Sequence, residues 1–322
     1  MRKTALISGC SGQDGSYLAE RLLSLGYQVV GMVRRSSVCE NQTSRIQHLL
    51  DRLILRYGDV TDSLSCDRVV QEFGFHEVYH LAAMSQVRIS FDVPQYTAQT
   101  NAIGVLNMLE AVRRYAPDAH FYMSSSSEMF GSSVDEDNYQ RETTPMHPTS
   151  PYGCAKLFGY SITRHYRRAY DMFAANGILF NHSSPRRGAN FVEQKVVRGA
   201  VAISQGKQDK LVLGNMDAKR DFGHSRDYVK AMHMILNHEE PDDFVIATGE
   251  TRSVRDVCEM VFSLLGMDYR KYVHTDTEYM RPQELPYLRG DSHKARFVLG
   301  WEPTVTFEEM IKEMVEVAQN AN

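Results

Sequence analysis

Residues 4–15 read Thr4-Ala5-Leu6-Ile7-Ser8-Gly9-Cys10-Ser11-Gly12-Gln13-Asp14-Gly15, a short apolar run that leads into a Gly-x-x-Gly-x-x-Gly loop. The glycines permit a tight turn and let backbone N–H groups approach a pyrophosphate. An apolar stripe then predicts a helix, whose positive N-terminus would also attract an anion. Such a turn also forms without a ligand, so the loop alone leaves both interpretations open. The stripe consists of Tyr17, Leu18, Leu22, Leu23 and Leu25.

Short apolar segments alternate with helical patterns through the first half of the chain, which is typical of βαβ units in a parallel sheet. The predicted strands after the first are residues 28–33, 54–57, 77–80 and 120–123. A second helical stripe consists of Val105, Leu106, Leu109, Val112 and Tyr115. We therefore expect an α/β protein with a doubly wound parallel sheet of the Rossmann type, covered by helices on both faces.

The second predicted strand ends in Arg34-Arg35-Ser36-Ser37, where an NAD site usually presents an acid to the ribose hydroxyls. Two arginines and two hydroxyls suit a 2′-phosphate, although a solvated basic turn would have the same composition. The position at a strand end favours NADP over NAD. From fold position, Asp59 and Val60 should contact the adenine. The segment after strand four should line the nicotinamide ribose, through Leu81, Ala83 and Ser85.

The pattern loosens after residue 152, where a strand at 173–180 leads into an Arg-rich loop at 182–190. We expect residues 1–180 to form an NADP-binding lobe and residues 181–322 to form mainly a smaller substrate-binding lobe. Segments around 222–247 should return to the first lobe. A strand at 243–247, a helix at 254–265 and a final helix around 307–311 complete the predicted elements.

Composition and charge exclude several classes of partner. The 322-residue chain has a net charge of -4, so no overall basic field would hold nucleic acid or an acidic membrane surface. The five cysteines form no C-x-x-C pair, which argues against a metal site and a disulfide framework. The first apolar run ends at Ser8 and is too short for a signal peptide. A cytoplasmic protein without a metal ion is expected.

Tyr152 and Lys156 are four positions apart and would share one face of a helix. The ammonium group could then lower the pKa of the tyrosine, as a hydride-transfer site requires. Ser126 falls where a hydroxyl could bind the reacting oxygen, and Glu128 follows on what we expect to be a strand-end loop. From spacing alone, Glu128 could be a general base, a surface carboxylate or a helix-capping acid.

Separate strings of the chain together resemble the extended short-chain dehydrogenases and, among them, the GDP-mannose 4,6-dehydratase family over nearly the whole length. These strings are residues 8–18, 34–37, 125–131, 150–156, 176–182, 184–188 and 213–221. The resemblance implies that Ser126, Glu128, Tyr152 and Lys156 are catalytic. It implies that a GDP-sugar is the substrate, that NADP is the cofactor, and that the chain forms a homo-oligomer, a dimer or a tetramer.

The resemblance also assigns binding residues. Together with the glycine loop and the positions at strand ends, it places the cofactor on Gly9, Ser11, Gly12, Gln13, Asp14, Arg34, Arg35, Ser36, Ser37, Asp59, Val60, Leu81, Ala83, Ser85, Tyr96, Tyr152, Lys156, His182 and Arg187. It places the substrate on Ser85, Ser126, Asn181, Lys195, Arg220, Arg281 and Glu284. In an acidic protein, a doubly charged pyrophosphate needs such local arginines and lysines.

The implied reaction is redox neutral. Tyr152 accepts the C4 hydroxyl proton as the hydride leaves, Glu128 removes the C5 proton that the new ketone acidifies, and the C6 hydroxyl departs as water. Either Glu128 or Ser127 could deliver the acid proton. A GDP-heptose dehydratase, a nucleotide-sugar reductase, an epimerase and a non-catalytic NADP-binding module remain as alternatives, and some relatives also reduce their own product.

The chain departs from the family pattern at Met84, where the family has Gln, and at Ser183, where it has Glu. Both positions are expected near the sugar or the nucleotide, so the choice between a hexose and a heptose is less secure than the type of reaction. The segment between Arg35 and Ile54 is also shorter than in many relatives, which could change the contact between subunits.

Overall fold

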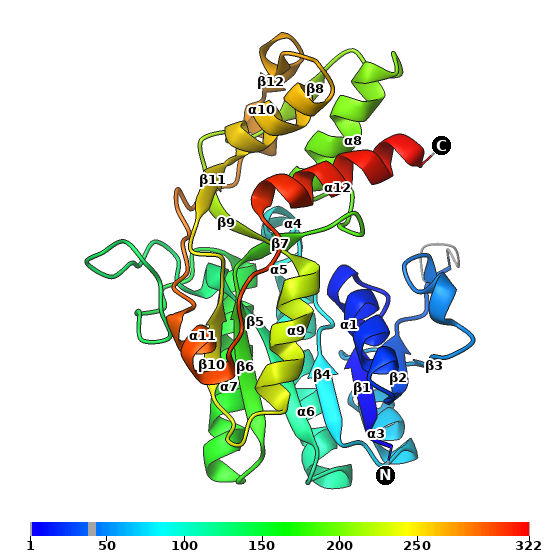
Figure 1. Ribbon diagram of the computed structural model, residues 1–322. Coiled ribbons are helices and arrows are strands. Elements are labelled where there is room, and N and C mark those ends of the chain that lie inside the picture. The colour runs from blue at the N-terminus through cyan, green and yellow to red at the C-terminus, as the bar shows by residue number, and fades with distance from the viewer. Residues whose placement is uncertain (1, 38–42, 322) are drawn as a thin grey trace.

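The computed structural model describes residues 2–37 and 43–321, so Cys39 and part of the segment after Arg35 lie outside the described residues. Within these ranges, seven parallel strands form the main sheet in the order β10-β6-β5-β4-β1-β2-β3 (Figure 1). They are β10 (Asp243–Ile246), β6 (Ala174–Leu179), β5 (His120–Ser126), β4 (Glu77–His80), β1 (Thr4–Ser8), β2 (Gln28–Val33) and β3 (Ile54–Tyr57).

Alternate residues of each strand face opposite layers of helices, as a strand period of two requires. On β1, Ala5 and Ile7 pack into one core and Leu6 packs into the other. The first layer consists of α1 (Gln13–Ser24), α9 (Ser225–Leu236) and α11 (His293–Leu299). The second consists of α3 (Ser63–Glu72), α6 (Gly104–Tyr115) and α7 (Pro151–Ala169). The predicted doubly wound α/β fold is confirmed.

The last residue of each helical stripe predicted from the sequence is exposed and does not join a core. Leu25 follows the last residue of α1 and is 49% exposed, and Tyr115 ends α6 and is 41% exposed. Residues at a helix end lie beyond the last turn that packs on the sheet, so an apolar side chain there can remain in solvent.

A smaller group of elements lies beyond the carboxyl ends of the main strands, at the top of Figure 1. Its sheets contain β7 (Asn181–Ser183), β9 (Lys219–His224) and β11 (Thr251–Ser253), and β8 (Leu211–Leu213) and β12 (Val273–Thr275). Its helices are α8 (Val192–Ser204), α10 (Val254–Leu264) and α12 (Phe307–Asn320), which share an apolar core. The chain returns from β9 to the main sheet through α9 and β10.

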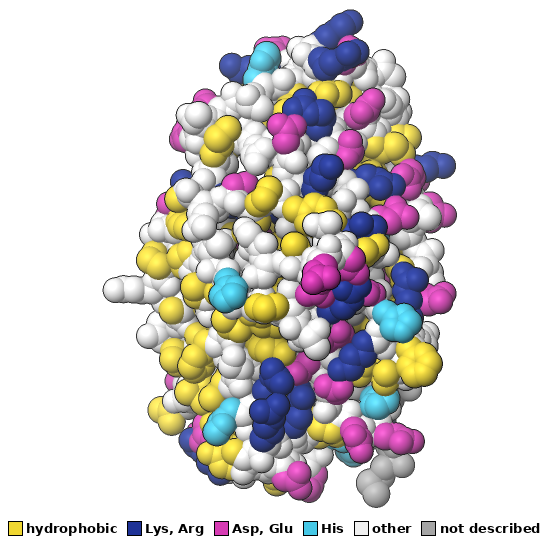
Figure 2. Space-filling view, turned by 90° about the vertical axis from the view of Figure 1, so that its left-hand side faces the viewer, with side chains coloured by type: hydrophobic (Ala, Val, Ile, Leu, Met, Phe, Trp, Pro, Cys, Tyr) yellow, Lys and Arg dark blue, Asp and Glu magenta, His cyan; other side chains and the backbone are white. Residues whose placement is uncertain are grey.

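Short elements lie between the main strands and helices of both lobes. They are α4 (Val87–Asp92), α5 (Pro94–Ala98), the π-helix η2 (Gln99–Ile103), and the 3-10 turns η1 (Gln47–Leu49), η3 (Ser127–Met129), η4 (Tyr269–Lys271) and η5 (Thr277–Tyr279). None of the helices in residues 2–37 and 43–321 has the length and apolarity needed to cross a bilayer. On the face shown in Figure 2, basic and acidic side chains are interspersed, so this face carries no field of a single sign.

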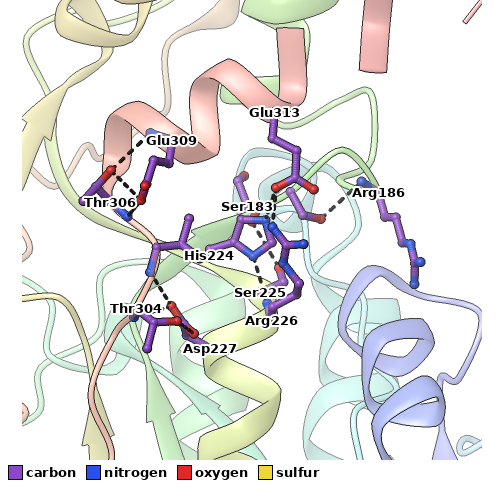
Figure 3. Close-up of polar contacts among 12 residues, drawn as sticks. Ser183, Arg186, His224, Ser225, Arg226, Asp227, Thr304, Thr306, Glu309 and Glu313 are labelled. Atoms are coloured by element: carbon purple, nitrogen blue, oxygen red, sulfur yellow. Dashed lines mark hydrogen bonds and ion pairs between the residues drawn. The ribbon is translucent and has the colours of Figure 1, made fainter. Parts of the chain in front are cut away.

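Asp227 on α9 fixes the segment that leads into α12 (Figure 3). Its buried carboxylate accepts hydrogen bonds from Thr304 N at 2.7 Å, Thr304 Oγ1 at 2.6 Å and Val305 N at 2.9 Å. Nearby, Glu313 of α12 pairs with Arg226 and lies 3.3 Å from His224 Nε2. These contacts hold the last helix against the junction of β9 and α9.

We expect Asp227→Asn to lower the free energy of unfolding by about 2–4 kcal/mol, because an amide nitrogen would face buried N–H donors. Burial raises the pKa of Asp227, but the Thr304 and Lys230 contacts bring it below its ordinary value. The stabilisation is therefore present above the ordinary pKa of an aspartate and is lost as the pH falls through the lower folded value. Urea denaturation measures both effects, and Asp217→Asn, at a 77% exposed side chain, should change stability by less than about 0.5 kcal/mol.

Candidate active site

The loop between β1 and α1 has the geometry of an anion-binding turn. Gly9 has φ +71°, and a Cβ there would lie 2.9 Å from the backbone of Ala82. A Cβ on Gly15 would lie 2.4 Å from Gly9 O, so no side chain fits at either position. The N-cap residue Gly12 provides no side-chain cap, which leaves the first N–H groups of α1 available to an anion.

A cavity of about 850 Å³ extends from this loop across the carboxyl ends of the main strands to the smaller lobe. It crosses the point between β1 and β4 where the strand order reverses, the usual ligand crevice of open α/β sheets. All of the residues assigned from the sequence line it except Arg35, Ser36 and Ser37. The cavity brings together the predicted cofactor, catalytic and substrate residues from both halves of the chain.

Arg34 is the member of the basic strand end that reaches the cavity. Its guanidinium donates to the hydroxyl of Tyr96 and lies 6.0 Å from that ring. Arg35 instead donates to the backbone oxygen of Ser36. Arg35, Ser36 and Ser37 are not among the residues that line the cavity, so the four residues that looked alike in the sequence occupy different surroundings.

Ser126 and Glu128 belong to regular secondary structure and not to a loop. Strand β5 continues through three serines beyond residue 123, and Ser126, its last residue, pairs with Leu179. The Ser126 hydroxyl then caps η3 by accepting from Glu128 N at 3.2 Å. The expected strand-end loop is therefore wrong: a strand and a short helical turn place both side chains in the cavity wall, with 8% and 7% exposure.

Helix α7 presents Tyr152 and Lys156 to the same cavity. Ser150 caps the helix by accepting from Gly153 N at 3.0 Å, and Pro151 occupies its first turn, where a missing N–H costs nothing. Lys156 Nζ donates to Ser124 O at 2.7 Å and lies 5.8 Å from the centre of the Tyr152 ring. The predicted shared face is confirmed, but the ammonium binds the backbone of β5.

Burial dominates the titration of this pair. It raises the pKa of Tyr152 to about 12, with Glu128 adding to the rise, while the hydroxyl of Ser126 and the charge of Arg187 oppose it. Burial also lowers the pKa of Lys156 to about 8. The expectation that Lys156 lowers the tyrosine pKa is not met, because the lysine is directed to Ser124 O and both groups are removed from water.

We expect Lys156→Met to stabilise the fold while removing hydride transfer. A pKa lowered from 10.5 to about 8 corresponds to about 3 kcal/mol of unfavourable burial of the charged form. Losing the bond to Ser124 O offsets about 1 kcal/mol of that gain. The gain is present at neutral pH and shrinks as the pH rises from about 8 towards 10.5, where the wild-type lysine is neutral in both states.

Urea denaturation of the cofactor-free protein near pH 7 and near pH 10 measures this gain and its pH dependence. Lys312→Met, at a 65% exposed side chain, is the matched control and should stay within about 0.5 kcal/mol of wild type. A Lys156→Met protein less stable than wild type at neutral pH would contradict the burial argument.

His182, Asp14 and Gln13 join the nucleotide loop to β7. His182 Nε2 lies 2.8 Å from Asp14 Oδ2, and its Nδ1 lies 2.8 Å from Phe180 O. Burial raises the pKa of Asp14, but His182 and Arg187 bring it below the ordinary value. Gln13 spans the same joint through His182 O and the hydroxyl of Ser184. Residues predicted to contact a cofactor are thus already held by one another.

The predicted substrate residues form a charged cluster around Glu128. Arg281 Nη1 lies 3.1 Å from Glu128 Oε1 and 3.5 Å from Glu284 Oε1. Arg220 donates to Glu284 at 2.8 Å and is itself 5% exposed. Lys195 Nζ lies 4.0 Å from the centre of the Tyr279 ring. The carboxylate proposed as a base from the sequence is therefore an ion-pair partner of an arginine proposed to bind the substrate.

Sequence reasoning missed two residues that support the cavity wall. Asn101 in the π-helix η2 binds both backbone groups of Met84 at 2.8 Å. Glu193, which lines the cavity, accepts from Ser183 Oγ at 2.9 Å. For Asn101 the signal was an Asn inside a helical pattern, where its helix propensity is poor. For Glu193 it was an acid in the first turn of α8, a position where an acid commonly stabilises the helix N-terminus.

The two departures from the family pattern are not part of the cavity lining. Neither Met84 nor Ser183 is among its lining residues, and Ser183 is fully buried. Ser85, which follows Met84, and Glu193, which contacts Ser183, do line the cavity. In the described residues, no group of His, Cys, Asp and Glu has a metal-binding arrangement.

A family model described as GDP-mannose 4,6 dehydratase matches residues 6–314 of the chain. Among curated proteins, GDP-mannose 4,6 dehydratase 2 of Arabidopsis thaliana is 47% identical, over 98% of this chain and 86% of that protein. The GDP-mannose 4,6-dehydratase of Sinorhizobium fredii is 46% identical, over 98% and 96% of the two chains.

Among solved structures, a UDP-glucose 4-epimerase with UDP-glucose from Thermotoga maritima superposes with a TM-score of 0.86 at 24% identity, covering 98% and 99% of the two chains. A dTDP-glucose 4,6-dehydratase in complex with NAD from Bacillus anthracis gives 0.85 at 22% identity, covering 99% and 97%. These likenesses agree with the doubly wound fold described above.

Proposed function

The chain belongs to the GDP-mannose 4,6-dehydratase family, and we propose that it converts GDP-mannose to GDP-4-keto-6-deoxy-mannose and water. The observation that carries this proposal is the position of Glu128. Its carboxylate lies in the same cavity wall as Ser126 and Tyr152, and its charge acts on the pKa of Tyr152. A reductase needs only the hydroxyl groups of Ser126 and Tyr152, whereas elimination also needs a base that removes a carbon-bound proton.

The proposed cofactor is NADP, which would supply the acceptor and then the donor of the internal hydride. The residues present fit it: the Gly12 end of α1 suits a pyrophosphate, and Arg34 with Tyr96 offers a cation and a hydroxyl to a 2′-phosphate. Among the similar solved structures, the dTDP-glucose 4,6-dehydratase of Bacillus anthracis is in complex with NAD. RMD of Pseudomonas aeruginosa is complexed with NADPH. The choice of NADP rests on Arg34.

Each step of the proposed reaction uses a group already in the wall. Tyr152, whose pKa the hydroxyl of Ser126 lowers against the effect of burial, takes the C4 hydroxyl proton as the hydride leaves C4, and it gives a proton to C5 when the hydride returns to C6. Glu128 takes the C5 proton once C4 is a ketone, because the adjacent carbonyl acidifies that position. The same proton, delivered by Glu128 or through Ser127, leaves with the C6 hydroxyl as water.

The lobes are proposed to divide this work. Residues 1–180, with α9 and β10, would hold the cofactor, and most of residues 181–322 would hold the GDP-sugar. Lys195 and Arg220 come from the second part and line the cavity. A homo-oligomer, dimer or tetramer, is proposed from the family resemblance alone.

Incubation with GDP-mannose and a catalytic amount of NADP tests the function. We expect a 4-keto-6-deoxy product lighter by one water, with no lasting absorbance at the NADPH wavelength. Stoichiometric NADPH would contradict a redox-neutral cycle, and a product of unchanged mass would indicate an epimerase. Turnover of a GDP-heptose in preference to GDP-mannose would show that the sugar of the substrate is a heptose and not a hexose. Binding of NADP without turnover of any GDP-sugar would leave only a cofactor-binding module.

We expect Arg34→Ala to weaken NADP binding by about 10- to 100-fold and to leave NAD binding within about threefold, because only NADP carries the 2′-phosphate that a charged donor would bind. Arg35→Ala is the matched control, since Arg35 does not line the cavity, and a smaller effect is expected there. Fluorescence titration with both cofactors gives the two ratios. Equal losses of NAD and NADP affinity in Arg34→Ala would remove the preference for NADP.

A further inference from the structure

Glu128 and the residues around it form a chain of alternating charges. Arg281 lies between Glu128 and Glu284, at 3.1 and 3.5 Å, and Glu284 also accepts from Arg220 at 2.8 Å. All four residues line the cavity. The two guanidinium groups are thus balanced by two carboxylates, so a diphosphate entering this region has to compete with a carboxylate for a cation.

The two arginines differ in how firmly they are held. Arg220 is buried, and besides Glu284 it donates to Leu285 O at 2.7 Å and Lys219 O at 2.9 Å. The side chain of Arg281 is 23% exposed and forms ion pairs with the two carboxylates. A guanidinium on the cavity side with carboxylate partners can turn to another anion more readily than one tied to two backbone oxygens.

We propose that Arg281 is exchanged between Glu128 and the diphosphate of the bound nucleotide. In the free protein it pairs with Glu128, and in the complex it turns to the diphosphate and releases the carboxylate. This inference rests on the proposed function, which makes Glu128 the base and GDP the nucleotide. The exchange couples nucleotide binding by Arg281 to proton removal by Glu128. While Glu128 is paired with Arg281 its carboxylate is held away from a C–H proton, and the bound substrate frees it.

The exchange has a consequence that does not involve catalysis. Glu128 competes with GDP for Arg281, so the carboxylate should weaken nucleotide binding and assist release of the product. Glu128→Gln should then bind GDP more tightly than the wild-type protein, although it removes a residue of the site. A carboxylate that merely belonged to the binding surface would give no such gain specific to Arg281.

Isothermal titration with GDP of the wild type, Glu128→Gln, Arg281→Gln and the double variant tests the exchange. We expect Glu128→Gln to tighten binding by about 5- to 30-fold, and we expect this gain to vanish in the Arg281→Gln background, as coupling through one contact requires. Glu278→Gln removes another carboxylate that lines the cavity, one on the exposed turn η5, and should change affinity by less than about threefold. Glu128→Ala, which cannot hold Arg281 either, should repeat the gain.

The outcomes separate the two proposals. If the wild-type protein does not bind GDP, the proposed function fails and the exchange fails with it. If the wild type binds GDP but the Glu128 variants bind it equally or less tightly, only the exchange is overturned. The same holds if the gain persists without Arg281 or if Glu278→Gln produces it equally, because general repulsion between negative charges would then explain it.

Discussion

Glu128→Gln is expected to lower formation of the 4-keto-6-deoxy product by about 10³-fold or more, while oxidation at C4 continues. Loss of a general base typically costs 10²–10⁴-fold, and about 10³ is the middle of that range. The amide keeps the shape of the side chain, so the wall around it should stay in place although the ion pair with Arg281 is lost. The reaction should therefore stop at the 4-keto sugar.

Two measurements separate this outcome from a general loss of activity. Single-turnover mixing with GDP-mannose should show NADPH that forms and persists, because no elimination product exists to accept the hydride. Exchange of the C5 proton with solvent deuterium should be lost in the same variant. Unchanged product formation in Glu128→Gln would remove the residue from the role of base.

Tyr152→Phe is expected to remove both hydride transfers, with a loss of about 10²–10⁴-fold in turnover. The C4 hydroxyl would then have no group to take its proton, and neither oxidation nor the return step could proceed. No NADPH should appear in a single turnover, in contrast to Glu128→Gln. NADP affinity should remain within about threefold, because the missing hydroxyl belongs to the proton path.

Tyr160→Phe provides the matched control for this variant. Tyr160 lies on the same helix and is similarly buried, but it packs with Phe130 and Phe180 in a core and does not line the cavity. Its turnover should stay within a few-fold of wild type. A clear NADPH signal in Tyr152→Phe would assign the proton transfer to another group, with Ser126 as the nearest candidate.

The fold was predictable because each strand is short, apolar and bounded by turn residues. Strands β2, β3 and β4 begin and end where the sequence pattern placed them. Strand β5 runs three residues further than predicted, because its serines pair with β6 although they look like a loop by composition. Backbone pairing with β6 makes this segment a strand, and its side-chain composition does not indicate that pairing.

The membership of the site was predictable from motifs, but its internal contacts were not. Tyr152 and Lys156 share a helix face as their spacing requires, yet the lysine is bonded to Ser124 O on a neighbouring strand. Arg281 is 153 positions from Glu128, and no local pattern indicates that they pair. Long charged side chains choose their partners in the folded state, where burial and competing acceptors decide the geometry.

The departures from the family pattern illustrate the same limit. Ser183 replaces a family carboxylate, and the sequence alone suggests a site that lacks one. The fold instead brings Glu193 to within 2.9 Å of Ser183 Oγ, so a carboxylate lines this part of the cavity after all. A contact between strand β7 and helix α8 was needed to see it.

In the proposed reaction, one hydride leaves C4 of the sugar and returns to C6 of the same sugar, with Glu128 acting between the two steps. GDP-mannose labelled with deuterium at C4 tests it most directly, by locating the label in the product. We predict that the deuterium is found at C6 of GDP-4-keto-6-deoxy-mannose. Deuterium that is recovered in NADPH, lost to water or still at C4 would contradict the account.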